Sequence, residues 1–301
     1  MNTYNKIPQT IAEQSQLLLD KGLICDKQKL ERYLSSIAYH RLSVYWHNYL
    51  SFSDDKFKPN TTFDNILDSY IFDRKLRLLI LEALERIEVA LRAKWSQELS
   101  LKYGSHAYTQ ENLFTSQQDY KKSIDKINKS FNKKSPAPYI IHYKTKYNSP
   151  KLPPIWAAVE VMSFGEISLW FANTKDNKIK DNIAKFFNLP NIQIVKTVFR
   201  ALSELRNICA HHERLWNRII VVTLPSIDKI KSELIYINDS QLDKHLYNYL
   251  VIIERLLKAT SPNTSWTKRL IELLNTMDNE THNAMGFPDN WQTRKPWCDC
   301  K

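Results

Sequence analysis

Glycine is scarce in this chain, with only 4 among its 301 residues. All-β and doubly wound folds need glycine at many turns, so this scarcity favours helices joined by short polar connections. The 4 cysteines are Cys25, Cys209, Cys298 and Cys300, and they show neither zinc-ligand spacing nor a disulfide framework. The sequence also lacks a tight acidic cluster of the kind that holds magnesium. We therefore expect an all-α protein that uses no metal and no other cofactor.

Long hydrophobic runs are absent as well. The best membrane candidate, residues 155–172, carries Glu160 and Glu166, which is typical of a buried helix rather than a transmembrane one. Residues 1–10 contain no apolar stretch, so we expect no signal peptide. These observations predict a cytoplasmic protein without a membrane partner.

Positive charge is what the sequence has in excess. The formal net charge is +11 and the pI is near 9.3, which suits a polyanionic partner such as nucleic acid. Charge alone leaves open a basic protein with no such partner. The hydrophobic fraction of 43% indicates a chain that folds. We predict a single all-helical domain over residues 1–301, with a core at about 30–220 and a helical extension at 221–301.

Capping signals predict two short helices near the N-terminus. Thr10 and Glu13 form a capping box that begins a helix ending at Gly22. Asp26 is placed to cap the next helix, and the aromatic-rich residues 39–50 follow it. A polar, proline-containing stretch at 51–62 separates this region from the next.

The longest predicted helix runs from about residue 62 to residue 101, and its apolar residues lie on more than one face, as in the centre of a bundle. These apolar residues are Leu67, Ile71, Leu78, Leu81, Leu84, Val89, Leu91 and Trp95. Its polar face carries Arg74, Lys75, Arg77, Arg86 and Arg92. Arg86 and Arg92 could line an RNA groove, and ion pairs with Glu85 or Glu88 are equally plausible from the sequence.

A lysine-rich insertion occupies residues 115–151 and is predicted to contain one short amphipathic helix. Its apolar residues are Tyr120, Ile124, Ile127 and Phe131, and its lysines are Lys121, Lys122, Lys126, Lys129, Lys133 and Lys134. Lys121, Lys122 and Lys126 are candidates for RNA contact. A solvated face is the other interpretation of such a run.

Three further helical regions are predicted towards the C-terminus. Residues 155–172 are expected to form one aromatic helix, and Asn188, with Pro190 in the first turn, is expected to cap the next. That next helix has a buried stripe at helical period, formed by Val195, Val198 or Phe199, Leu202, Leu205 and Cys209. Residues 226–275 are expected to add two or three helices.

The chemically suggestive residues cluster at the end of that striped helix. Arg206, Asn207 and His211 combine a permanent cation, an amide and an imidazole, which can bind a phosphodiester and move protons near neutral pH. Arg206 and His211 are five positions apart, so their directions differ by roughly 140° on one helix. This angle favours a dimer with a composite cleft. Cationic side chains that only stabilise the helix dipole are the alternative at this stage.

The segment RNICAHH, residues 206–212, resembles the R-N-x-x-x-H signature of HEPN ribonucleases. Residues 39–46, 72–95, 153–171 and 206–218 also resemble, in the expected order, stretches of the Abi-like family of AbiD/AbiF-type abortive-infection proteins. His40 stands where many relatives have a second tyrosine, and we interpret it as a packing position.

This resemblance implies a HEPN-type helical bundle and metal-independent endoribonuclease activity, used as a toxin in bacterial anti-phage abortive infection. It assigns Arg206, Asn207 and His211 to the active site, with His212 beside them. It further implies RNA as substrate, a homodimer with a composite site, and restraint by a small antitoxin RNA. A non-catalytic RNA-binding protein and a regulatory module of a defence operon remain alternatives. The basic residues nearest the motif, Arg214 and Arg218, are further candidates for RNA contact.

Overall fold

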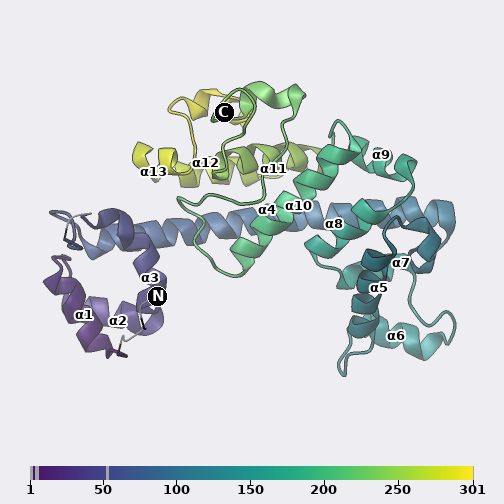
Figure 1. The fold of residues 1–301 in the computed structure, drawn as a ribbon, viewed down its shortest axis with the longest axis horizontal. Helices are drawn as coiled ribbons and strands as arrows, with labels where there is room; N and C mark the ends of the chain where they lie inside the picture. The colour runs from purple at the N-terminus through teal and green to yellow at the C-terminus, as the bar shows by residue number, and fades with distance from the viewer. Residues whose placement is uncertain (1–2, 4–6, 52–53, 301) are drawn as a thin grey trace. The chain divides into compact units, whose positions relative to one another are not determined.

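The computed structural model describes residues 3, 7–51 and 54–300. Throughout these residues the regular structure is helical, and extended backbone pairs only in isolated β-bridges, so the described part contains no strand. The all-α prediction is confirmed. Where the sequence suggests one domain, the chain divides into two compact units, residues 1–76 and 77–301, and helix α4 (Phe63–Tyr103) contributes to both (Figure 1).

The first unit contains α1 (Ile11–Asp20), α2 (Lys27–Ser36), α3 (Tyr39–Trp46), the 3-10 helix η1 (His47–Tyr49) and the start of α4. The predicted capping box of α1 is present, because Thr10 accepts a bond from the Glu13 N–H and Glu13 accepts one from the Thr10 N–H. Asp26 caps α2 through the N–H of Lys29 at 2.8 Å. Both helix starts therefore form as the sequence predicts.

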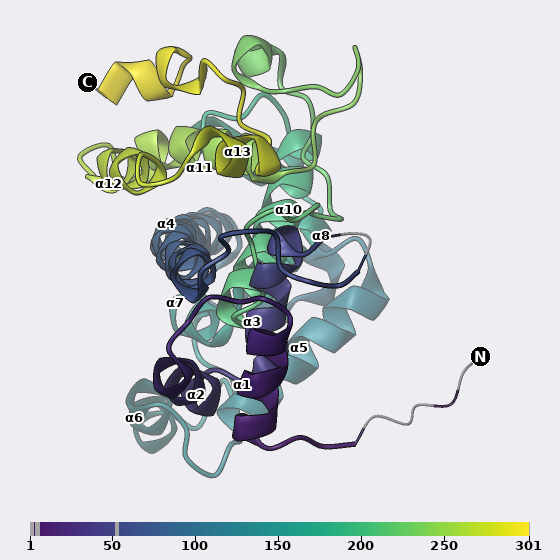
Figure 2. The same cartoon turned by 90° about the vertical axis from the view of Figure 1, so that its left-hand side faces the viewer.

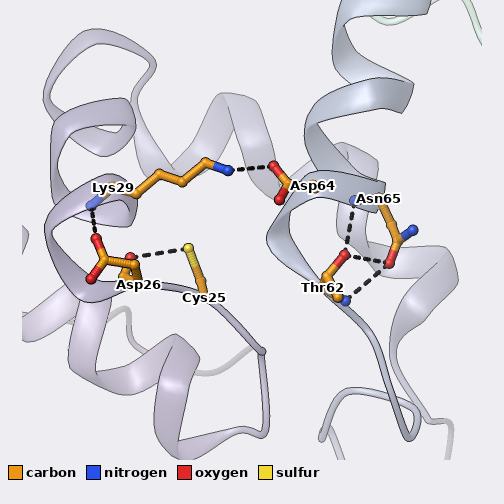
Figure 3. A network of polar contacts seen from close by, with 6 residues as sticks. All are labelled: Cys25, Asp26, Lys29, Thr62, Asp64 and Asn65. Atoms are coloured by element: carbon orange, nitrogen blue, oxygen red, sulfur yellow. Dashed lines mark hydrogen bonds and ion pairs between the residues drawn. The ribbon is translucent and has the colours of Figure 1, made fainter.

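A polar network joins the start of α2 to the start of α4 inside this unit (Figure 3). The Nζ atom of Lys29 lies 2.5 Å from a carboxylate oxygen of Asp64. Thr62 and Asn65 cap the first turn of α4, since the Asn65 amide oxygen accepts from the Thr62 N–H at 3.0 Å. His40 is exposed at the start of α3, so its interpretation as a packing position is wrong.

In the described residues of the second unit, the remainder of α4 is followed by nine further α-helices. They are α5 (Gln117–Phe131), α6 (Pro138–Lys146), α7 (Ile155–Ala158), α8 (Phe164–Asn173), α9 (Asn177–Phe186), α10 (Ile192–Ala210), α11 (Leu246–Thr260), α12 (Trp266–Leu274) and α13 (Asn279–Ala284). The 3-10 helices are η2 (Ala107–Thr109), η3 (Glu111–Leu113), η4 (Val159–Val161), η5 (Asp228–Glu233), η6 (Trp291–Thr293) and η7 (Trp297–Cys300). In Figure 2, which looks along α4, α11–α13 lie together on one side of that helix.

The aromatic side chains of α4 and α8 form the centre of this unit. Trp95 and Trp170 are buried with ring centroids 5.7 Å apart, and the indole N–H of Trp95 donates to the hydroxyl of Thr174 at 3.0 Å. Helix α8 packs against both α5 and α10. Trp266 at the start of α12 is fully buried, and its indole N–H donates to the carbonyl of Leu79 on α4 at 2.7 Å.

The single helix predicted over residues 155–172 is wrong. The chain instead forms α7, η4 and α8, because Ser163 and Glu166 make a capping box that begins a new helix at Phe164. A capping box satisfies the free N–H groups of a helix start, so it stabilises a new helix within an otherwise apolar stretch.

The predicted role of Asn188 is also wrong. With φ of 53° it ends α9, a helix not predicted from the sequence, while Asn191 caps α10 by accepting from the Ile194 N–H at 2.9 Å. Asparagine tolerates the left-handed conformation required after a helix C-terminus, which explains this exchange of roles.

The long-helix prediction is confirmed in its position and only partly in its faces. Leu78 and Val89 are 51% and 52% exposed, and Arg77, expected on the polar face, is buried. The long helix thus leaves some apolar surface uncovered within the second unit.

Candidate active site at the end of α10

Helix α10 is held in the second unit by its buried stripe. Val195, Val198, Phe199, Leu202 and Leu205 are each fully buried, as the periodicity predicts. Because this apolar face packs into the core, the last turn of α10 lies at the border of the core. The side chains of Arg206 and Asn207 in this turn are half-buried. The motif therefore begins on a rigid element and ends where the helix stops.

The helix ends in a Schellman motif formed by the histidines and the residue after them. His211 is the C-cap, and the N–H of His212 donates to the carbonyl of Cys209 at 3.1 Å. The N–H of Glu213 donates to the carbonyl of Ile208, also at 3.1 Å. His212 has φ of 58°, the left-handed conformation that this motif requires. The turn presents both imidazoles to solvent, since His211 and His212 are exposed.

Arg206 differs from the histidines in its surroundings. Its Nε atom is buried and has no hydrogen-bond partner among the described residues. Burial of an N–H group without a partner costs free energy. Native proteins that keep such a group commonly do so because it has a functional role or a partner that is not observed. The guanidinium of Arg206 therefore lies near the core and keeps an N–H donor that can bind a ligand.

A carboxylate of α4 acts electrostatically on Arg206, and sequence reasoning did not assign it to the site. Burial raises the pKa of Glu88, and the guanidinium groups of Arg92 and Arg206 lower it in part. Glu88 forms an ion pair with Arg92 one turn along α4, which is one of the two roles considered for Arg92 from the sequence. The i, i+4 spacing of Glu88 and Arg92 in the sequence predicts that they pair with each other. It does not predict that α10 packs beside them.

Arg92 also connects α4 to the segment before α8. It donates to the carbonyl of Met162, and its Nη1 atom lies 3.8 Å from a carboxylate oxygen of Glu160 in η4. Since the Arg92 and Glu88 side chains are only 17% and 14% exposed, this is a partly desolvated network rather than a surface pair. It places fixed charges next to the last turn of α10.

The two arginines after the motif make contacts within their own loop. Arg214 donates to the carbonyl of Asn217 at 3.3 Å. Arg218 forms an ion pair with Glu213 at 2.6 Å and donates to the carbonyl of Arg214 at 3.3 Å. These contacts hold the loop together, so any contact of Arg218 with phosphate requires competition with Glu213.

The lysine-bearing helix α5 is amphipathic as predicted. Tyr120, Ile127 and Phe131 are buried, while Lys121 and Lys122 are exposed. Lys126 differs because its Nζ atom lies 3.3 Å from the capping carboxylate of Glu166 on α8. The insertion is thus attached to the core through α8, and its free positive charge lies on the opposite face.

Two searches of the described residues bear on other classes of site. No group of three or more histidine, cysteine, aspartate or glutamate side chains is arranged to hold a metal ion. No helix in the same residues has the length and apolar character needed to cross a membrane. Cys298 is half-buried in η7, and the side chain of Cys300 lies outside the described residues.

Comparison with known proteins identifies one family. The model of the family described as Abi-like protein matches residues 32–217, which include α4, the lysine-bearing helix and the entire Arg206–His211 motif. No curated protein and no solved structure matches the chain.

Proposed function

The chain belongs to the Abi-like protein family, and from this premise we propose that it is a metal-independent HEPN endoribonuclease that acts as a toxin in abortive infection. One observation supports the proposal above the others. Arg206 is held half-buried, and its Nε–H has no partner in the described part of the chain, while His211 and His212 are exposed on the turn that follows it. A fixed cation and two imidazoles, all within seven residues, are the groups that such a reaction uses.

The proposed reaction uses the nucleophile that RNA itself carries. An imidazole removes the proton from a 2′-hydroxyl, the O2′–P bond forms, and the P–O5′ bond breaks as a second imidazole protonates the leaving O5′. The products are a 2′,3′-cyclic phosphate and a 5′-hydroxyl. Arg206 stabilises the anionic phosphorane through its bidentate fork, and Asn207 orients the phosphate or the histidine.

We propose that two copies of α10 assemble this site. The five-residue separation of Arg206 and His211 aims them in different directions on one helix, so a second copy supplies the missing group more easily. Apolar surface near the motif supports such a homodimer, because Ile219 and Val221 are 63% and 84% exposed. The net charge of +11 supports RNA as substrate and a small antitoxin RNA as the restraining partner.

The test compares growth and RNA integrity in bacteria that express wild-type protein or His211→Ala, with Arg206→Ala as a second variant. We expect wild type to arrest growth and leave RNA ends with 2′,3′-cyclic phosphate, and both variants to do neither. Arg200→Ala is the matched control, since Arg200 is an exposed arginine on the same helix. Equal toxicity of wild type and His211→Ala would indicate the non-catalytic RNA-binding alternative or a regulatory role.

A further inference from the structure

Aromatic side chains are exposed on α6, on α7 and between them. Trp156, Tyr147 and Tyr139 are 57%, 48% and 36% exposed. All eight tryptophans lie within the described residues, and each of the other seven is at most 5% exposed. Trp156 is therefore the single tryptophan of the chain that this structure presents to solvent. So large an apolar ring, left uncovered in an otherwise buried class of residue, indicates a binding surface.

Trp156 lies on the helical segment that supplies a carboxylate to the Arg92 network. α7 continues directly into η4, so Trp156 and Glu160 lie four residues apart on one continuous helical segment. Glu160 in turn lies 3.8 Å from Arg92, which pairs with Glu88. The exposed indole therefore lies four residues before a carboxylate that reaches Arg92, and Arg92 pairs with the Glu88 that acts on Arg206.

Tyr139, in the first turn of α6, interacts electrostatically with the same charges. Burial raises the pKa of Tyr139, the Glu160 carboxylate raises it further, and the Arg92 guanidinium opposes this rise. Tyr139 on α6 thus interacts with the Arg92–Glu160 pair, and Trp156 on α7 lies four residues before Glu160. We call these two side chains the aromatic strip.

Hydrogen bonds join helix α6 to the end of the lysine-bearing helix and to the segment that precedes α7. Lys144 donates to the carbonyl of Phe131 at 2.6 Å, and the Tyr143 hydroxyl donates to the carbonyl of Leu152 at 2.9 Å. At the end of α6, the Nζ atom of Lys146 lies 5.5 Å from the centroid of the Tyr147 ring. The neighbourhood of the strip is rich in lysine as well as in aromatic rings.

We propose that the aromatic strip is a stacking site for the bases of single-stranded RNA, next to the phosphate held at Arg206. Aromatic rings interleaved with lysines are the combination by which proteins hold single strands, because the rings stack on bases and the ammonium groups follow the phosphates. A duplex keeps its bases stacked internally and cannot use such rings. The position of the strip relative to the scissile phosphate rests on the proposed ribonuclease function, whereas the stacking itself does not.

The experiment titrates full-length His211→Ala protein, chosen to keep the RNA intact, with a ten-nucleotide oligouridine. Tryptophan emission and Kd are measured over a range of salt concentrations. We expect emission to be quenched on binding, and Trp156→Phe to lose the quenching while keeping Kd within a few-fold. Trp156→Ala should weaken binding about ten-fold. Its salt dependence should be unchanged, because that slope counts phosphate contacts. Trp156→Ala should leave the Kd for duplex RNA unchanged.

Phe186→Ala is the matched control, because Phe186 is an exposed aromatic residue on α9, 39% accessible, and should leave Kd unchanged. Unaltered oligouridine affinity in Trp156→Ala would overturn the proposal. So would an emission change that depends on protein concentration without RNA, since a second copy of the chain would then cover Trp156. If the titration shows stacking at Trp156 but the wild-type protein does not cleave RNA, the proposed function is rejected and the stacking site is retained.

Discussion

The N–H of Glu213 donates to the carbonyl of Ile208 over 3.1 Å, and this bond closes the turn that follows α10, whose C-cap is His211. The turn that it closes forces His212 into the left-handed conformation, with φ of 58°. A helix end of this type is usually completed by glycine, which adopts that conformation without strain. The backbone at position 212 needs only a residue that tolerates a positive φ, whereas any role in catalysis needs the imidazole. A glycine at this position therefore tests the imidazole without disturbing the backbone.

Replacing His212 with glycine should retain the fold and reduce cleavage. The glycine backbone suits a positive φ, so we expect the free energy of unfolding to stay within about 1 kcal/mol of wild type. Loss of the imidazole should lower the rate of RNA cleavage by roughly 100-fold, a usual contribution of an acid–base group. Thermal unfolding and single-turnover cleavage measure the two effects. His212→Val is the contrasting variant and should lose stability as well, and a fully active glycine variant would remove His212 from the site.

Replacing Glu88 with glutamine should impair cleavage more than RNA binding. Glu88 attracts Arg206, so its neutralisation should let the guanidinium leave its position and lower kcat by roughly 10- to 100-fold. Neutralising Glu88 makes the protein one unit more positive, so RNA affinity should stay the same or increase. A general loss of structure would instead lower RNA affinity. Glu85→Gln is the matched control, because Glu85 is an exposed glutamate on the same helix. Equal kcat in both variants would show that Glu88 does not position Arg206.

Charge reversal on α5 should weaken RNA binding and flatten its salt dependence. Lys121 and Lys122 are exposed, so a double change to glutamate alters charge without breaking a described ion pair. Loss of two phosphate contacts should reduce the slope of log K against log salt by about 1.4 for a single strand. Lys126 is omitted because it pairs with Glu166. A double change at the exposed Lys229 and Lys268 gives the same net charge as a control, and an equal slope in both proteins would support the solvated-face interpretation.

Asp176 should contribute a pH-dependent part of the stability. Its pKa is lowered to about 2 by the Lys102 ion pair, the Tyr103 hydroxyl and the N–H groups that it caps at the start of α9. Because its folded pKa lies below the unfolded value of 3.8, its contribution is complete above pH 3.8 and is lost as pH falls through about 2. Asp176→Ala should lower the free energy of unfolding at pH 7 by about 1 kcal/mol.

Denaturant unfolding at several pH values measures this effect. Asp176→Asn keeps a capping side chain and should lose only the ion pair, so its difference from wild type should shrink as the pH approaches 2. A difference that is constant over this range would show that the carboxylate charge contributes nothing.

Local signals in the sequence predicted several elements closely. The capping residues Thr10 and Asp26 predicted the starts of α1 and α2, and apolar period predicted the buried stripe of α10. They succeeded because a cap or a stripe is satisfied within one or two turns of its own helix. The same reasoning failed at Asn188, where two helix ends compete for the same few polar residues.

The sequence by itself determined an all-α chain, a strongly basic surface, and a helix that carries Arg206, Asn207 and His211 at its end, since composition and helical period are local properties. Only the tertiary structure showed that Glu88 acts on Arg206, that Arg92 links α4 to Glu160, and that Trp156 alone among the tryptophans remains exposed. These relationships join residues up to 118 positions apart, the separation of Glu88 and Arg206. Their contact depends on how whole helices pack, and no local pattern specifies it.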